Sequence, residues 1–248
     1  RDLGYLDFNE PFKKLYHQGT ITKDGSKMSK SKGNTVSPDD FIEEYGSDTF
    51  RCYLMFMGPF DEGGDWNDKG IKGIYRFLNK IITICNRPDT DETELDYQKI
   101  IHKTIKGVGE DLERIKFNTA ISKLMTCSNE LNSAKSISIN DKKVLIKLLA
   151  PFAPHLSEEL WEDLGEEISI FNNDWPEYSK NLIIDDTMTI AIQVNGKLRG
   201  SIDVDKNIDK ENILKLSKDN NNVQKFIKGK IIVKEIYIPN KLISLVVK

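Results

Sequence analysis

The chain has 248 residues, of which 38% are hydrophobic and 30% charged, and its formal net charge is −3 at pH 7. This length allows two or more domains, and the composition allows each of them to bury a core. No stretch of 18 apolar residues occurs, so we expect no transmembrane helix. Residues Arg1–Gly4 include no initiator methionine and do not resemble a secretory signal, so we expect a piece of a longer protein.

The spacing of the cysteines indicates the redox state of the cellular compartment and whether a metal site is expected. Cys52, Cys85 and Cys127 lie far apart and form no CxxC pair. We therefore expect free thiols in a reducing cytoplasm and no protein-bound metal in these residues.

Charge is unevenly distributed along the chain. Residues 1–34 hold 7 Lys and Arg against 4 Asp and Glu, a net charge of +3, and residues 187–248 hold 12 against 6, a net charge of +6. The residues between them therefore carry −12. A basic C-terminal region suggests contact with a polyanion, although a chance lysine excess in a Lys-, Asn- and Ile-rich sequence explains it equally well.

Turn and helix-cap signals predict short strands, turns and two helices in the first 65 residues. Short strands and turns are expected over residues 1–26, with Asp24-Gly25 as a hairpin turn. Cap and proline signals predict helices over roughly 37–46 and 48–57. Residues 58–65 are expected to form a loop.

From residue 66 onward the apolar residues recur with a helical period. The stripes cover 71–85, 101–115, 121–131, 144–149 and 156–164. They predict an antiparallel helical bundle across roughly 66–165.

The C-terminal residues alternate as strands do. Two alternating runs flank Asn195-Gly196, the strongest short hairpin signal in the chain. The expected elements are strands over 188–194 and 197–204, helices over 209–218 and 222–228, and strands over 231–238 and 242–247. They predict a small ββααββ domain.

Residues 27 to 34, Lys-Met-Ser-Lys-Ser-Lys-Gly-Asn, are the most informative stretch. Three lysines alternate with small side chains, and Gly33 permits a turn that other residues disfavour. Rotatable ammonium groups in a loop before a helix can follow the changing charge of a polyphosphate. The alternative is a solvated lysine-rich loop, because charge runs usually face water.

These residues contain KMSKS, the signature of the class I aminoacyl-tRNA synthetases, and longer stretches resemble the same class. "KMSKSKGNTVSPDDFIEEYGSDTFRCYLMF" resembles the loop and following helices of the members for aliphatic amino acids. "RDLGYLDFNEPFKKLYHQG", "APFAPHLSEELWEDLG" and "IQVNGKLRG" are most similar to the bacterial leucyl family. The resemblance covers essentially the whole chain.

The resemblance implies ATP-dependent attachment of leucine to tRNA(Leu). It implies that Lys27 and Lys30 are catalytic, holding the ATP phosphates and stabilising charge as pyrophosphate leaves, with Lys30 foremost. Met28, Ser29 and Ser31 complete the implied ATP-binding set, Met28 by packing and the serines through hydroxyl or backbone contacts. Mg²⁺ is implied with ATP in the full-length enzyme, without a ligand from these residues.

Combined with the element pattern, the resemblance implies a multidomain, mainly α protein. Residues 1–65 would be the end of a catalytic domain, with the KMSKS loop and stem-contact helices. Residues 66–180 would be a helical-bundle tRNA-binding domain, and residues 187–248 a C-terminal α/β tRNA-binding domain.

The HIGH motif of the class does not occur in these residues, nor do the amino-acid pocket and the editing domain. ATP and leucine would therefore bind through a catalytic domain outside this sequence. We expect these residues alone not to form the adenylate.

The implied tRNA contacts are cations. They are Lys197 and Arg199 on one face of a hairpin strand, Lys225, Lys228 and Lys230 in a second basic cluster, and Arg76 in the bundle. An ordinary solvated surface is the alternative for every group, and it is preferred for the helix edge that Arg76 shares with Lys80 and Arg87.

Three hypotheses for function follow. The first is the C-terminal part of a leucyl enzyme, the second a piece of an isoleucyl or valyl relative, and the third a stand-alone, non-catalytic tRNA-binding protein. The intact lysine loop favours the first over the third, because a pure binder needs no phosphate-holding loop. The C-terminal string favours the first over the second. We expect a cytoplasmic monomer that does not contact membranes.

Overall fold

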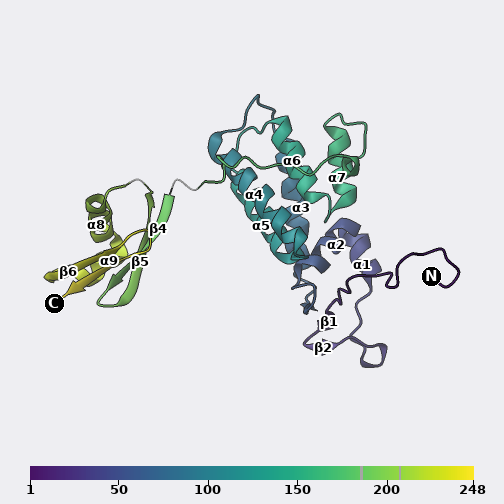
Figure 1. Cartoon of the computed structure of the whole chain (residues 1–248), viewed down its shortest axis with the longest axis horizontal. Helices are drawn as coiled ribbons and strands as arrows, with labels where there is room; N and C mark the ends of the chain where they lie inside the picture. Colours follow the sequence, from purple (N-terminus) through teal and green to yellow (C-terminus); the bar gives the residue numbers. More distant parts are fainter. Residues whose placement is uncertain (185–186, 207) are drawn as a thin grey trace. The chain divides into compact units, whose positions relative to one another are not determined.

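The computed structural model describes residues 1–184, 187–206 and 208–248. They form two compact units, Arg1–Ile183 and Ile184–Lys248 (Figure 1). The first unit is mainly helical and the second is a small α/β structure, as the sequence predicted. Within the described residues, no helix is long and apolar enough to cross a membrane.

The first unit begins with a small sheet and short helices. Their bounds are β1 Thr20–Lys23, β2 Ser26–Lys27, the 3-10 helix η1 Lys30–Lys32, α1 Pro38–Tyr45, α2 Ser47–Phe56 and β3 Gly63–Trp66. β1 pairs antiparallel with β2 and parallel with β3, so the strand order is β2-β1-β3. The predicted hairpin is therefore confirmed.

The expectation of a loop throughout residues 58–65 is wrong, because β3 begins at Gly63. Two glycines give this strand no alternating pattern that the sequence could reveal. They are needed because β1 approaches closely: a Cβ atom on Gly63 would lie 2.3 Å from the Thr20 carbonyl oxygen. Backbone proximity, rather than side-chain pattern, forms this strand.

The helical part of the first unit follows β3. Its elements are α3 Ile71–Cys85, α4 Leu95–Glu113, α5 Phe117–Leu131, α6 Ile139–Leu149, α7 Pro154–Asp163 and the 3-10 helix η2 Ile170–Asn172. The predicted stripe on α3 is buried throughout, from Ile71 to Cys85. In Figure 1, α4 and α5 run side by side. These helices share one apolar core with α2 and β3, so the proposed division at residue 65 stays a prediction.

Trp66 joins the small sheet to the helices. It is the last residue of β3 and is only 4% exposed. Its ring lies 4.9 Å from that of Phe41, 5.0 Å from that of Tyr53 and 5.7 Å from that of Phe50, between ring centroids. One side chain therefore anchors α1, α2 and β3 together.

Asp48 makes a second connection, between α2 and α7. Its buried carboxylate accepts a hydrogen bond from the backbone N–H of Leu156 at 2.7 Å and lies 2.9 Å from Nδ1 of His155. Both residues are in the first turn of α7, where free N–H groups need acceptors. The cap of α7 is thus supplied by another helix.

The second unit has the predicted ββααββ order. Its elements are β4 Thr187–Val194, β5 Lys197–Asp205, α8 Lys210–Asp219, α9 Asn221–Ile227, β6 Ile232–Ile238 and β7 Leu242–Val247. The strand order is β5-β4-β7-β6, with β4 and β7 parallel and the other pairs antiparallel. The unit buries a core of its own.

The three cysteines are free and buried, as expected for thiols. Burial raises the pKa of Cys52 and of Cys85 to about 12, and that of Cys127 to about 11. The thiolate is the reactive form, so these side chains serve packing rather than chemistry.

Replacing Trp66 with alanine should destabilise the first unit by about 3–5 kcal/mol, because it removes a large buried ring from three aromatic contacts. Urea unfolding followed by far-UV circular dichroism measures this loss. Trp175, which is 40% exposed, is the matched control, and its replacement should cost less than about 1 kcal/mol. Equal losses for the two variants would contradict the anchoring role of Trp66.

Candidate functional site

The lysine loop extends from a hairpin that β3 holds in place. Asp24 and Gly25 both have positive φ, 53° and 68°, which forms the tight turn between β1 and β2. Asp65 on β3 reaches this turn: its Oδ1 accepts hydrogen bonds from the Thr22 hydroxyl at 2.6 Å and from the Gly25 N–H at 2.9 Å. Sequence reasoning missed Asp65, because no pattern links it to a turn forty positions earlier.

These two hydrogen bonds favour the ionised carboxylate. The Thr22 hydroxyl, and next the Gly25 N–H, lower the pKa of Asp65 below its ordinary value of 3.8. A lowered pKa stabilises the fold above that ordinary value, and the contribution is lost as the pH falls through the lowered pKa. The hairpin is therefore held across the neutral range.

Inside the loop, Asn34 and Ser29 organise the backbone. Asn34 Oδ1 accepts from the Ser29 N–H at 2.8 Å, and its Nδ2 donates to the Lys27 carbonyl at 3.3 Å. Ser29 Oγ accepts from the Lys32 N–H at 3.3 Å, which caps η1, and Gly33 ends η1 with a φ of 65°. The sequence predicted the glycine turn but gave no signal for the role of Asn34.

The lysine side chains of the loop are exposed to solvent. Lys27, Lys30 and Lys32 are exposed, and within the described part of the chain no ion pair involves them. Met28 is half-buried and packs against the main core, so it tethers the loop at its start. Three ammonium groups that have no ion-pair partner among the described residues, on a tethered turn, suit a polyanion.

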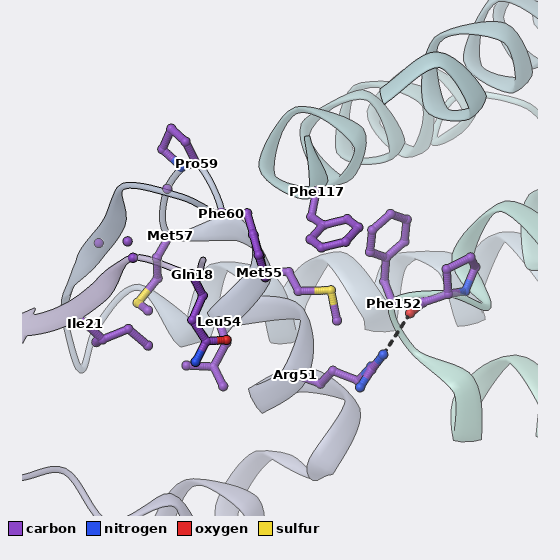
Figure 2. A pocket seen from close by; sticks show the side chains of 15 residues that line it. Gln18, Ile21, Arg51, Leu54, Met55, Met57, Pro59, Phe60, Phe117 and Phe152 are labelled. Atoms are coloured by element: carbon purple, nitrogen blue, oxygen red, sulfur yellow. Dashed lines mark hydrogen bonds between the residues drawn. The ribbon is translucent and has the colours of Figure 1, made fainter. Parts of the chain in front are cut away.

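A pocket of about 410 Å³ lies in the same unit, and Figure 2 shows its lining. Ile21 of β1 lines it, together with side chains of α2 and with Phe117 and Phe152. Arg51 also lines the pocket and donates a hydrogen bond from Nη2 to the Pro151 carbonyl at 3.3 Å. No sequence signal predicted this pocket, because its lining is brought together only by folding.

One contact links the strand that carries Lys197 and Arg199 to the helix that carries Lys225. The guanidinium of Arg199 lies over the ring of Phe226, 3.9 Å from its centroid, and Phe226 adjoins Lys225 in the sequence. A β-bulge near Ile192 shifts the register where β5 carries Arg199. Lys197, Lys225, Lys228 and Lys230 are exposed. Arg199 is half-buried, so part of its side chain serves packing.

Lys80 and Arg87, which the sequence placed on one helix edge with Arg76, have hydrogen-bond partners. Arg87 donates to the carbonyls of Leu131 at 2.6 Å and Asn132 at 2.7 Å, at the end of α5, and Lys80 donates to Asn129. Arg76 is exposed on α3. Of these three cations, Arg76 is the one that makes no hydrogen bond or ion pair within the described residues, and its contact with tRNA stays a prediction.

Comparisons with known proteins cover both units. Residues 5–65 match the family described as tRNA synthetases class I (I, L, M and V), and residues 98–214 match the anticodon-binding domain of tRNA ligase. Leucine–tRNA ligases of Petrotoga mobilis and Clostridium beijerinckii match all of this chain at 43% and 46% identity. In each case the match covers 33% of the relative.

A solved structure is also similar. It is that of LeuRS from Agrobacterium radiobacter K84 in a ternary complex with tRNA and LeuAMS. The match has a TM-score of 0.71 and 31% identity, and it covers 100% of this chain and 35% of that chain. The chain thus spans about a third of the length of the relatives it matches.

The lysine loop, the helical region and these matches define a part of a class I aminoacyl-tRNA synthetase. Within that class the chain belongs to the leucyl-tRNA synthetase family and corresponds to a C-terminal part of its members. The hypothesis of an isoleucyl or valyl relative is not favoured by these matches.

Replacing Asp65 with alanine should speed hydrogen exchange at the Gly25 amide at neutral pH, because the acceptor that protects this N–H is removed. Asp65→Asn keeps an acceptor oxygen and should retain most of the protection. Asp61→Ala, at an exposed position nearby, is the control and should leave the Gly25 rate unchanged. An Asp65→Ala rate equal to that of the unaltered chain would rule out this anchoring.

Proposed function

We propose that this chain supplies the ATP-phosphate-binding loop and tRNA-binding surfaces of a leucine–tRNA ligase, which attaches leucine to tRNA(Leu) in an ATP-dependent reaction. The observation that carries the proposal is the lysine loop, whose exposed ammonium groups have no ion-pair partner among the described residues. Membership of the leucyl family supports the substrate assignment.

In the proposed reaction, Lys27 and Lys30 donate hydrogen bonds to phosphate oxygens of ATP. Negative charge grows on the pyrophosphate as it leaves. Positioned cations therefore stabilise the transition state more strongly than the bound ATP of the ground state. Lys27 ends β2 and Lys30 begins η1, so both occupy the anchored ends of the turn. Lys30 is assigned the main role.

The remaining loop residues position the lysines. Ser29 accepts the Lys32 N–H and lies 3.1 Å from the Ser31 hydroxyl, so these two serines fix the curvature of the turn. Met28 packs against the core and keeps the loop from detaching. Magnesium would accompany ATP, and no ligand for it is assigned to these residues.

The proposed tRNA contacts of the second unit are Lys197, Arg199, Lys225, Lys228 and Lys230. Their support is the contact of Arg199 with Phe226, which places one cation of the hairpin strand beside the end of α9. We refer to these five cations as the basic surface of the second unit. Because most of these cations are exposed lysines, the expected contacts are to phosphates and not to base edges.

The stand-alone tRNA-binding protein is the less favoured candidate. It would share the second-unit surface, but a binder that performs no chemistry has no use for an organised set of phosphate-binding lysines. The two candidates therefore differ in whether the lysine loop binds a polyphosphate.

The double variant Lys27→Gln/Lys30→Gln should bind inorganic tripolyphosphate at least about 10-fold more weakly, because it removes two of three unpaired charges from the loop. Isothermal titration calorimetry of the whole chain at low salt measures the affinity. Lys13→Gln/Lys14→Gln, at exposed positions outside the loop, is the matched control.

Equal affinity in the two double variants would overturn the phosphate-binding assignment. The chain by itself should show no leucine-dependent ATP–pyrophosphate exchange, since the HIGH motif is not among its residues. Exchange by the purified chain would contradict that expectation.

The variant Lys197→Gln/Lys225→Gln/Lys228→Gln should weaken binding of a tRNA(Leu) transcript and flatten its salt dependence. Each lost phosphate contact should reduce the slope of log affinity against log salt by about 0.7–0.9. Arg199 is kept, because its loss would also expose Phe226. Fluorescence anisotropy at several salt concentrations measures both quantities.

The matched control is Lys206→Gln/Lys215→Gln/Lys241→Gln, three other exposed lysines of the same unit. The control removes the same total charge, so it separates a local surface from a general electrostatic effect. Identical slopes for the two triple variants would reject the proposed surface.

A further inference from the structure

A hollow of about 590 Å³ on the first unit is lined by two tyrosines and three cations, Tyr45, Lys69, Lys72, Tyr75 and Arg76. We refer to it as the tyrosine hollow. Arg76 was a candidate from the sequence, but its four neighbours were not. The hollow lies within one compact unit, so its geometry does not depend on how the two units are placed.

Helix periodicity explains why these side chains gather. Lys72, Tyr75 and Arg76 are spaced by three and four positions and share one face of α3. The opposite face of α3 carries the buried apolar stripe, so this face is turned to solvent. Tyr45, the last residue of α1, meets Tyr75 edge to face, with 5.5 Å between ring centroids.

The positive charge of the hollow is not neutralised by its neighbours. Within the described residues, no ion pair involves Lys69, Lys72 or Arg76. The adjacent carboxylate of Asp68 is engaged elsewhere, 3.7 Å from Lys23 Nζ and 2.6 Å from Trp66 Nε1. Glu44 is next to Tyr45 in the sequence, and its hydrogen bond with the Tyr45 hydroxyl raises the pKa of that tyrosine.

The tyrosines give the hollow a second kind of contact. Tyr75 is 43% exposed, and Tyr45 supports it from the side. A tyrosine ring that is fixed by an edge-to-face neighbour offers a surface on which a nucleobase or ribose can pack with little loss of side-chain freedom. Cations beside such a ring can meet the phosphates on either side of the packed nucleotide.

We propose that the tyrosine hollow binds the sugar–phosphate backbone of RNA, with Lys69, Lys72 and Arg76 on phosphates and Tyr75 against one nucleotide. This inference rests on the proposed function, because it assigns a further binding surface for the same tRNA. The tyrosine hollow belongs to the first unit, whereas the proposed basic surface belongs to the second. An acidic protein segment would satisfy the cations but not use the paired rings, so RNA is the occupant that fits both features.

The test compares three variants of the whole chain by fluorescence anisotropy with a labelled tRNA(Leu) transcript. Lys72→Gln/Arg76→Gln should bind about 10-fold more weakly at 0.1 M salt. Its salt slope should fall by about 1.4–1.8, or about 0.7–0.9 for each lost phosphate contact. Tyr75→Leu should bind about 5–10-fold more weakly with an unchanged slope, since packing on the ring involves no counterion. Arg76→Lys keeps the charge and should keep the slope.

Arg114→Gln/Lys135→Gln removes two exposed cations of the same unit outside the hollow and is the matched control. Thermal melting by circular dichroism checks that every variant is folded. If the unaltered chain binds tRNA and Lys72→Gln/Arg76→Gln matches the control in affinity and slope, the hollow is not an RNA site, while the proposed function stands.

Two further outcomes are decisive. If the unaltered chain shows no salt-dependent tRNA binding, the proposed function fails and this inference fails with it. If Lys72→Gln/Arg76→Gln loses binding to a polyglutamate peptide but keeps its affinity for tRNA, the hollow is assigned to an acidic protein partner and the RNA proposal is overturned.

Discussion

The placement of the lysine loop depends on one short strand, β3, whose consecutive residues point to opposite sides. Trp66 enters the core between α1 and α2, while Asp65 faces the hairpin and accepts hydrogen bonds from Thr22 and Gly25. A strand's side chains alternate by necessity, so burying the tryptophan also aims the carboxylate at the turn. The exposed cations are thereby connected to the core through two residues.

Single charged side chains also connect helices to one another. Asp48 of α2 satisfies the first turn of α7, and Arg87, near the end of α3, satisfies carbonyls at the end of α5. Helix ends leave unpaired backbone groups, and charged side chains from neighbouring helices supply the partners here. Some charged residues in this chain therefore hold helix ends together, and others form ion pairs, as Lys142 does with Asp89. The lysine loop, the tyrosine hollow and most of the basic surface of the second unit carry exposed cations instead.

The exposed cations lie on both compact units, which fits the binding of a long polyanion at several points. Lysines dominate the loop and the second unit, whereas the tyrosine hollow combines lysine and arginine with aromatic rings. Phosphate contacts position a nucleic acid and carry little sequence information. We therefore expect these surfaces to orient tRNA in the proposed ligase rather than to distinguish one tRNA from another.

The sequence by itself determined the family, the helical stripes of the first unit, the ββααββ order of the second and the lysines of the loop, because each depends on local spacing or on a contiguous string. Only the tertiary structure decided the roles of Asp65 and Asn34, the strand at Gly63–Trp66, and the separation of Arg76 from Lys80 and Arg87. It also decided that Arg199 packs on Phe226. These features arise from contacts between residues distant in the sequence or from hydrogen-bond geometry, and neither leaves a periodic trace in the order of amino acids.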